Sequence, residues 1–260
     1  MKTHIWAACI VLIALNASRA NAQPAPPALS DDLTQPETQP LIQSQHKYLV
    51  MPASFDILRD ERAIWKDMFR PHEGEAKWVI PIVGVNALAI STDAFAYKNF
   101  KPSDTVQTAS HAVSSLGAPY PLFAAGASMY LIGRYTDDLR LRETGILGTQ
   151  ALVHSIIMTG VFESATNRKQ PNGSGGTGFW KGGDAWPSGH ASMFWALSTV
   201  VAEQYHDSSP VRYGAYLLAT AVSVSRFTGR QHFPSDALAS SLVGYLVGRW
   251  VVHHRSTTRN

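Results

Sequence analysis

The sequence predicts an all-α fold, a bundle of about six core helices with a candidate active site at one end and an N-terminal extension before it. Three observations predict this fold. Apolar segments separated by polar turns fill the chain from residue 78 onward, they are longer than ordinary strands, and they show no sustained apolar–polar alternation. The six segments are 78–92, 116–133, 144–162, 191–202, 213–225 and 237–248.

The composition excludes several classes of protein. Of 260 residues, 45% are hydrophobic and 16% are charged, which is too apolar for a disordered chain. The formal net charge is +3, and Lys2 and Arg19 lie in a segment that we expect to be removed. A protein this close to neutral lacks the basic stripe that binding to a phosphate backbone requires, so we expect no nucleic-acid partner.

Residues 1–22 are typical of a signal peptide. Lys2 supplies a positive start, residues 5–15 form an apolar run, and residues 20–22 form a small-x-small cleavage site. The alternative is a membrane anchor, although the run is shorter than the roughly 20 residues of a spanning helix. We therefore predict an exported protein, periplasmic or secreted. Cys9 is the only cysteine, so the mature chain contains no disulfide and no thiolate site.

Two further segments precede the bundle. Residues 23–47 are rich in proline and polar residues and are predicted to be a flexible leader. Residues 48–77 contain apolar and charged residues at helical spacing, which predicts one or two amphipathic helices. Such helices cap a core or lie on a membrane surface, and both alternatives stay open. The main helical domain is expected over 78–255.

The lengths of the apolar segments bear on whether the bundle crosses a bilayer. Only 116–133 and 144–162 approach the length that spanning requires. The segments 213–225 and 237–248 are bounded by charged residues and are too short, and the mean hydropathy is −0.08. We favour a soluble or peripherally attached bundle, with integral or peripheral association with the inner membrane as the alternative.

A first group of chemically active residues opens the fourth predicted helix. Pro187-Ser188-Gly189-His190 places a hydroxyl and free backbone N–H groups at a helix start, where the helix dipole favours an anion. His190 follows directly. The glycine-rich loop over 172–184 lacks the spacing of a nucleotide-binding P-loop, and we interpret it as a mobile loop beside a site.

A second group lies between the fifth and sixth predicted helices. Ser225-Arg226 is followed by His232 and then, four residues later, by Asp236. This spacing places His232 and Asp236 on one face of a helical turn, so the carboxylate can hold one imidazole nitrogen and leave the other as a nucleophile. Arg226 can bind two oxygens of a tetrahedral oxyanion at once.

These two motifs resemble the second and third signatures of the type 2 phosphatidic acid phosphatase and vanadium haloperoxidase superfamily. The resemblance covers about residues 78–252. It implies that His232 attacks phosphorus to form a phosphohistidine, that Asp236 orients His232, and that His190 protonates the leaving oxygen. It also implies that Ser188, Gly189 and Arg226 bind the phosphate oxygens and that no metal or other cofactor takes part.

The sequence departs from the first signature of that family, which is Lys-x6-Arg-Pro. Glu163 stands at the lysine position and Gln170 at the arginine position. A phosphoryl-transfer site depends on positive charge, so we expect Arg168 to bind phosphate in their place, with Lys169 as a second possible substitute. The alternatives are weakened activity, or a structural role in which Glu163 pairs with Arg168.

The resulting prediction is an exported enzyme that hydrolyses a phosphate monoester or a lipid (di)phosphate, with a membrane surface as a possible partner. Two other classes stay open. A haloperoxidase would hold vanadate covalently on His232, and an anion-binding relative with weakened catalysis would follow from the altered first signature. The oligomeric state is left open by the sequence.

Overall fold

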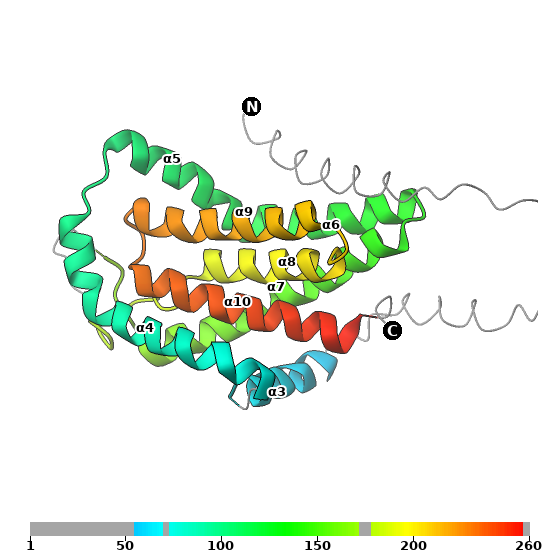
Figure 1. Ribbon diagram of the computed structural model, residues 1–260, viewed down its shortest axis with the longest axis horizontal. Helices are drawn as coiled ribbons and strands as arrows, with labels where there is room; N and C mark the ends of the chain where they lie inside the picture. The colour runs from blue at the N-terminus through cyan, green and yellow to red at the C-terminus, as the bar shows by residue number, and fades with distance from the viewer. Residues whose placement is uncertain (1–54, 70–72, 172–177, 257–260) are drawn as a thin grey trace, which may run out of the picture.

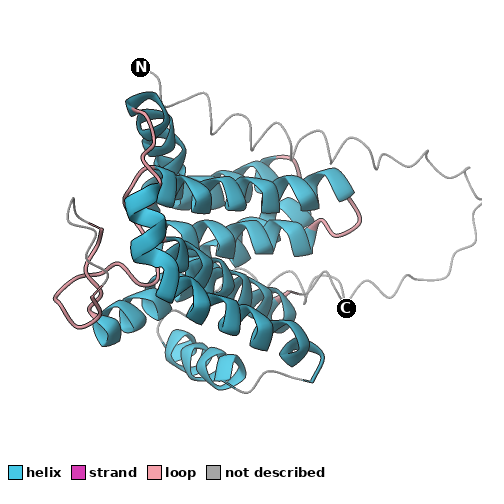
Figure 2. Ribbon diagram, turned by 60° about the vertical axis from the view of Figure 1, so that its left-hand side comes forward, coloured by secondary structure: helices cyan, strands magenta, loops and turns pink. Residues whose placement is uncertain are grey.

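The computed structural model describes residues 55–69, 73–171 and 178–256. These residues form α-helices joined by loops and one 3₁₀ turn, which confirms the all-α prediction (Figure 2). The predicted signal peptide and leader lie outside the described residues. The helices are α3 (Phe55–Phe69), α4 (Glu73–Asn99), α5 (Asp104–Ser114), η1 (Ser115–Gly117), α6 (Pro119–Tyr135), α7 (Leu139–Thr166), α8 (Gly189–Gln204), α9 (Ser209–Thr228) and α10 (Pro234–Arg255).

Five of the six apolar segments lie within longer helices, whereas 116–133 begins in η1 and continues into α6. α9 has 20 residues and α10 has 22, because the charged residues that bound the predicted segments lie inside them. Arg226 and Asp236 are buried and bonded at the helix ends, so their charges do not terminate the helices. α5 was not predicted from the sequence. It is a largely polar helix capped by the Ser103 side chain, which accepts a hydrogen bond from the Val106 N–H.

α8 forms the centre of the bundle. It packs against α7, α9 and α10, and Figure 1 shows it lying between α9 and α10. Its inner residues Ala196 and Val200 are completely buried, and they belong to a core cluster shared with α7 and α10. A second cluster joins α8 to α6 and α9. The apolar faces predicted from the sequence therefore meet around this one helix.

Two helices lie on the outside of the bundle. α3 is a single amphipathic helix, as predicted for this part of 48–77. Ile64 joins the core, and Glu61 lies 2.7 Å from Nδ1 of the buried His154. α4 crosses the α10 side of the bundle (Figure 1) and exposes large apolar side chains, among them Leu88 and Phe95.

Among the residues that the structure describes, two helices are long and apolar enough to cross a membrane, judged by length and composition. They comprise 76–99 in α4 and 139–166 in α7. From the sequence, the segments 116–133 and 144–162 were expected to approach this length instead. α6 has only 17 residues, whereas α4 extends well past both ends of its predicted segment. In α7 half of the apolar window is buried by neighbouring helices, against 17% in α4.

The contact between α8 and α10 depends on glycine at position 244. A Cβ there would lie 2.2 Å from the Ser192 carbonyl oxygen, a backbone atom that cannot move away easily. Gly214 in α9 offers a matched control, because a Cβ there would meet nothing within 4 Å. We predict that Gly244→Ala lowers the free energy of unfolding by about 2 kcal/mol through overpacking. Gly214→Ala should leave it unchanged or raise it. Equal melting temperatures for the two variants would contradict this close packing.

Candidate active site

The predicted site residues gather at one end of the bundle. α8 begins there, α9 ends there, and the short connection to α10 follows (Figure 1). η1 closes the same end, because a Cβ on Gly117 would lie 2.8 Å from the His190 carbonyl oxygen. Residues that lie more than 40 positions apart in the sequence are thus brought to one place.

His232 lies in the loop between α9 and α10, and its side chain is buried. Its backbone N–H donates to the Arg226 carbonyl, which folds the loop back on the end of α9. Its Nδ1 lies 2.9 Å from the Ala185 carbonyl oxygen. A carbonyl only accepts, so Nδ1 carries the proton, and in the neutral ring Nε2 has the free electron pair.

This arrangement corrects one detail of the sequence prediction. Asp236 was expected to hold the imidazole nitrogen, yet its Oδ2 lies 3.5 Å from His232 Nδ1 and instead accepts the Phe233 N–H at 2.8 Å. The carbonyl of Ala185 provides the hydrogen bond. The four-residue spacing at the start of α10 brings the Asp236 carboxylate close to the ring, but the two groups are not hydrogen-bonded.

Arg226 is a buried cation. Its Nη1 donates to Ser114 at 2.5 Å and to Gln231 at 2.8 Å, while Nε has no hydrogen-bond partner. Within the described part of the chain no carboxylate pairs with it. Burial lowers the pKa of the Arg226 guanidinium to about 10. A buried positive charge without a counter-ion is unfavourable, and an anionic ligand would relieve it.

The start of α8 supplies a second group with an unsatisfied atom. The Ser188 N–H donates to Ser240 at 2.6 Å, whereas the Ser188 hydroxyl is buried, makes no cap bond and has no partner. Gly189 is the first residue of α8, where the helix dipole is positive. Hydroxyl and helix end together form the kind of environment that binds an oxyanion.

His190 is electrostatically coupled to both groups of the second motif. Burial first, and then the positive charges of Arg226 and His232, lower the pKa of His190 to about 4. These electrostatic effects indicate that His190, Arg226 and His232 lie near one another. His190 is neutral at neutral pH in the free protein, and a bound anion would raise its pKa.

Arg168 has a different environment from the one predicted. It is completely buried, with Nη2 2.6 Å from Asp93 and Nη1 2.5 Å from Asp236. The rings of Phe179 and Phe233 each lie 4.6 Å from its guanidinium carbon. Both terminal nitrogens are bound to carboxylates rather than directed to a free anion site, so the phosphate contact of Arg168 stays a prediction.

The other first-signature positions lie nearer the surface. Gln170 donates to Asp184 at 2.8 Å, and Lys169 is exposed. Glu163 points toward the start of α8, since its Oε1 lies 3.8 Å from the position that a Cβ on Gly189 would take. Burial and the charge of Asp184 raise the pKa of Glu163 to about 7. The predicted pairing of Glu163 with Arg168 is not among the ion pairs of the described residues.

Several residues of this end were not identified from the sequence. Ala185 orients His232 through a backbone atom, and Ser114 comes from the unpredicted helix α5. Asp93 was not identified either, although a carboxylate within the apolar part of α4 was a usable signal, because a buried carboxylate needs a partner.

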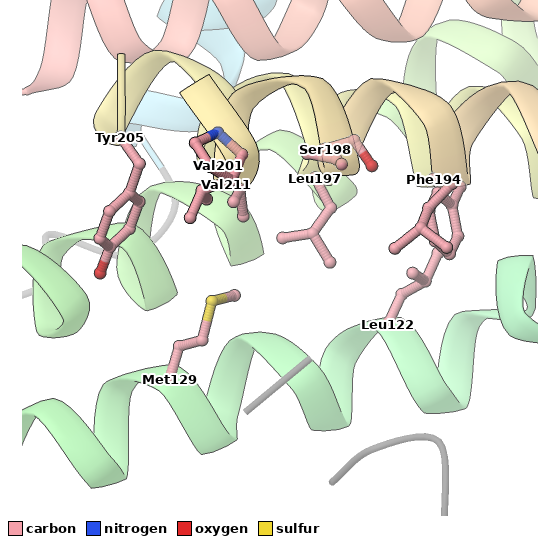
Figure 3. Close-up of a pocket in the computed structure, with 12 residues that line it drawn as sticks. Leu122, Met129, Phe194, Leu197, Ser198, Val201, Tyr205 and Val211 are labelled. Atoms are coloured by element: carbon pink, nitrogen blue, oxygen red, sulfur yellow. The ribbon is translucent and has the colours of Figure 1, made fainter. Parts of the chain in front are cut away.

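An apolar cavity runs along α8 away from these polar groups. Figure 3 shows Phe194 and Leu122 at one end and Tyr205 at the other. Phe194 follows His190 by about one helical turn. The cavity is bounded by α6, α8 and α9 and contains none of the predicted site residues.

The fold and the site define an all-α bundle with two histidines, a buried arginine and a helix start arranged at one end. Residues 146–259, a little under half of the chain, match the PAP2 superfamily. The match begins within α7, so α4, α5 and α6 lie outside it.

Individual relatives are distant or match over a short segment. A lipid A 1-phosphatase of Porphyromonas gingivalis is 33% identical over 66 residues, which are 25% of this chain and 15% of that protein. The crystal structure of Aquifex aeolicus LpxE has a TM-score of 0.49 and 15% identity, and covers 63% of this chain and 94% of its own. A transmembrane PAP2-type phosphatidylglycerolphosphate phosphatase from Bacillus subtilis has a TM-score of 0.48 and 17% identity, covering 77% and 96%.

The lowered pKa of His190 predicts a specific effect of pH on stability. The unfolded chain takes up a proton on this side chain near pH 6.5, whereas the folded chain does so only near pH 4. Protonation therefore favours the unfolded state, and stability falls as the pH decreases from about 6.5 to about 4. In phosphate-free buffer, His190→Gln should lose less unfolding free energy than the parent between pH 7 and 4.5. The same change at the exposed His206 is the control, and equal losses in parent and His190→Gln would refute the prediction.

Proposed function

We propose that the protein is a phosphatase that hydrolyses a lipid phosphate through a phosphohistidine on His232. The observation that carries this proposal is the buried Arg226, which has no carboxylate partner among the described residues and shares one neighbourhood with His190 and His232. A phosphate group would supply the missing negative charge. The unpartnered hydroxyl of Ser188 and the start of α8 at Gly189 support a tetrahedral oxyanion at this place.

The mechanism follows from the protonation states of the two imidazoles. Nε2 of His232 attacks phosphorus, the bond from phosphorus to the ester oxygen breaks, and protonated His190 gives its proton to the departing oxygen. Water then attacks the phosphohistidine and gives a proton to His190, the P–N bond breaks, and inorganic phosphate leaves. Arg226 and the α8 start bind the charge on the equatorial oxygens in both steps.

The negative charge of the substrate completes this cycle. In the free protein His190 is neutral at pH 7, because Arg226 and burial disfavour its cation. A phosphate dianion beside Arg226 reverses that effect and favours protonation of His190. Binding of the substrate phosphate therefore favours the protonated His190, which is the general acid of the reaction.

Two features support a lipid as the carrier of the phosphate. α4 exposes apolar side chains, with Leu88 69% and Phe95 71% accessible, so the protein has a surface suited to a membrane. The relative from P. gingivalis is named a lipid A 1-phosphatase. We further propose that residues 1–22 direct export and that the protein acts at a membrane surface outside the cytoplasm.

Phosphate release tests the proposal directly. We expect the parent to release phosphate from p-nitrophenyl phosphate and from a lipid phosphate, and His232→Ala to lose at least about 1,000-fold in kcat because the covalent route is removed. Arg226→Lys should lose about 100-fold, since a lysine binds as a point charge. Vanadate should inhibit and EDTA should not. Equal rates for His232→Ala and the parent would refute the phosphatase, and peroxide-dependent halide oxidation on addition of vanadate would favour the haloperoxidase.

The raised pKa of Glu163 predicts a loss of substrate affinity at alkaline pH. Its pKa of about 7 means that its carboxylate becomes negative as the pH rises above 7, beside the site that binds a dianion. The KM of the parent for a phosphomonoester should therefore rise several-fold between pH 6 and 8.5, and Glu163→Gln should rise less. Asp137→Asn removes an exposed charge before the opposite end of α7 and is the matched control. Parallel KM profiles for Glu163→Gln and the parent would show that Glu163 does not act on the substrate.

A further inference from the structure

α4 has polar residues on its buried face and large apolar residues on its exposed face. Asn86 and Asp93 are buried, whereas Leu88 and Phe95 are largely exposed. A step of two residues rotates a helix by about 200°, and a step of seven returns to the same face. The two polar residues therefore share the inner face, and the two apolar residues share the outer one.

The inner face of α4 binds the first turn of α10 at Ser235. The Asn86 side chain donates to the Ser235 carbonyl at 2.7 Å. Oδ1 of Asp93 accepts the Ser235 N–H at 3.1 Å, and Oδ2 accepts the Ser235 hydroxyl. Ser235 lies next to Asp236, so α4 contacts the turn that carries the charge beside His232.

Asp93 also shares a cation with Asp236. Nη2 of Arg168 binds Asp93 and Nη1 binds Asp236, and the side chains of all three residues are completely buried. Two carboxylates and one guanidinium leave this group with a net charge of −1 when both acids are ionised. Burial raises the pKa of Asp93, but the Arg168 guanidinium and the N–H and hydroxyl of Ser235 all donate to its carboxylate, which favours the ionised form.

We propose that Asp93 is a positioning residue for the reaction at His232. The inference rests on the proposed phosphatase function. With Asp93 present, Arg168 is divided between two carboxylates, and the group keeps a negative charge beside the imidazole. That charge stabilises the positive ring that forms when Nε2 bonds to phosphorus. Without Asp93, Arg168 neutralises Asp236 alone and the stabilisation is lost.

The proposed role of Asp93 should affect the binding of vanadate and of phosphate differently. Vanadate forms a bond to a nucleophilic imidazole and so depends on the charge beside His232. Inorganic phosphate is held by Arg226 and the start of α8 without such a bond. We therefore expect Asp93→Asn to lose about tenfold in vanadate affinity and less than about threefold in phosphate affinity. The kcat should fall about tenfold or more, and KM should change little.

Asn86→Ala is the matched control. It removes the other buried side-chain contact from α4 to Ser235 without changing a charge. It should lower the melting temperature but keep the kcat and the ratio of vanadate to phosphate affinity of the parent. Asp93→Glu retains the charge and should restore most of the ratio of vanadate to phosphate affinity. This variant distinguishes a loss of charge from poor folding of Asp93→Asn.

Both affinities are measured by calorimetry on the full chain, so they do not require turnover. A ratio in Asp93→Asn equal to that of the parent would overturn the proposal and leave Asp93 as a structural clamp. A parent that binds both anions but releases no phosphate would refute the phosphatase, while the ratio would still decide the role of Asp93. A parent that binds neither anion would overturn both.

Discussion

The buried positive charge of Arg226 is the constraint on which the functional end of the molecule depends. A guanidinium removed from water needs compensation, and within the described residues its Nη1 has only the uncharged oxygens of Ser114 and Gln231. The same charge disfavours the protonated form of His190. The buried charge of Arg226 is therefore unfavourable in the free protein, and the same charge would favour the binding of an anion. Under the proposed function, a bound phosphate would compensate the charge of Arg226 and favour the protonated form of His190.

Arg168 shows the opposite solution to the same physical problem. It is as deeply buried as Arg226, yet two carboxylates and two aromatic rings surround it. Its backbone carbonyl also accepts the N–H of Ala185, the residue whose carbonyl bonds to His232. Arg168 thus organises the turn before α8 and the start of α10 together. Arg168 is neutralised by carboxylates, whereas Arg226 has no carboxylate partner among the described residues.

The sequence predicted those parts of the site that lie in short motifs, and the structure shows why the rest escaped it. His190 was identified from its place beside a predicted helix start, and Arg226 and His232 from the motif that ends at Asp236. The hydrogen bond to His232 was assigned to Asp236, although it comes from the backbone of Ala185, 47 positions earlier, which no side-chain pattern reveals. The environment of Arg168 was also missed, because its second carboxylate, Asp93, lies 75 positions away. The helices were predicted well, but α9 and α10 were drawn too short because buried charged residues were taken as helix ends.

The position of Asp93 also bears on how the site is divided between regions of the chain. The segment that matches the PAP2 superfamily begins at residue 146, whereas Asp93 and Ser114 come from α4 and α5. Asp93 binds Arg168, and Ser114 accepts a hydrogen bond from Arg226. A segment beginning at 146 would leave Nη2 of Arg168 without the Asp93 carboxylate and Nη1 of Arg226 without the Ser114 hydroxyl. Because an unsatisfied buried charge is strongly destabilising, the matched segment depends on the helices before it for the electrostatics of its own site.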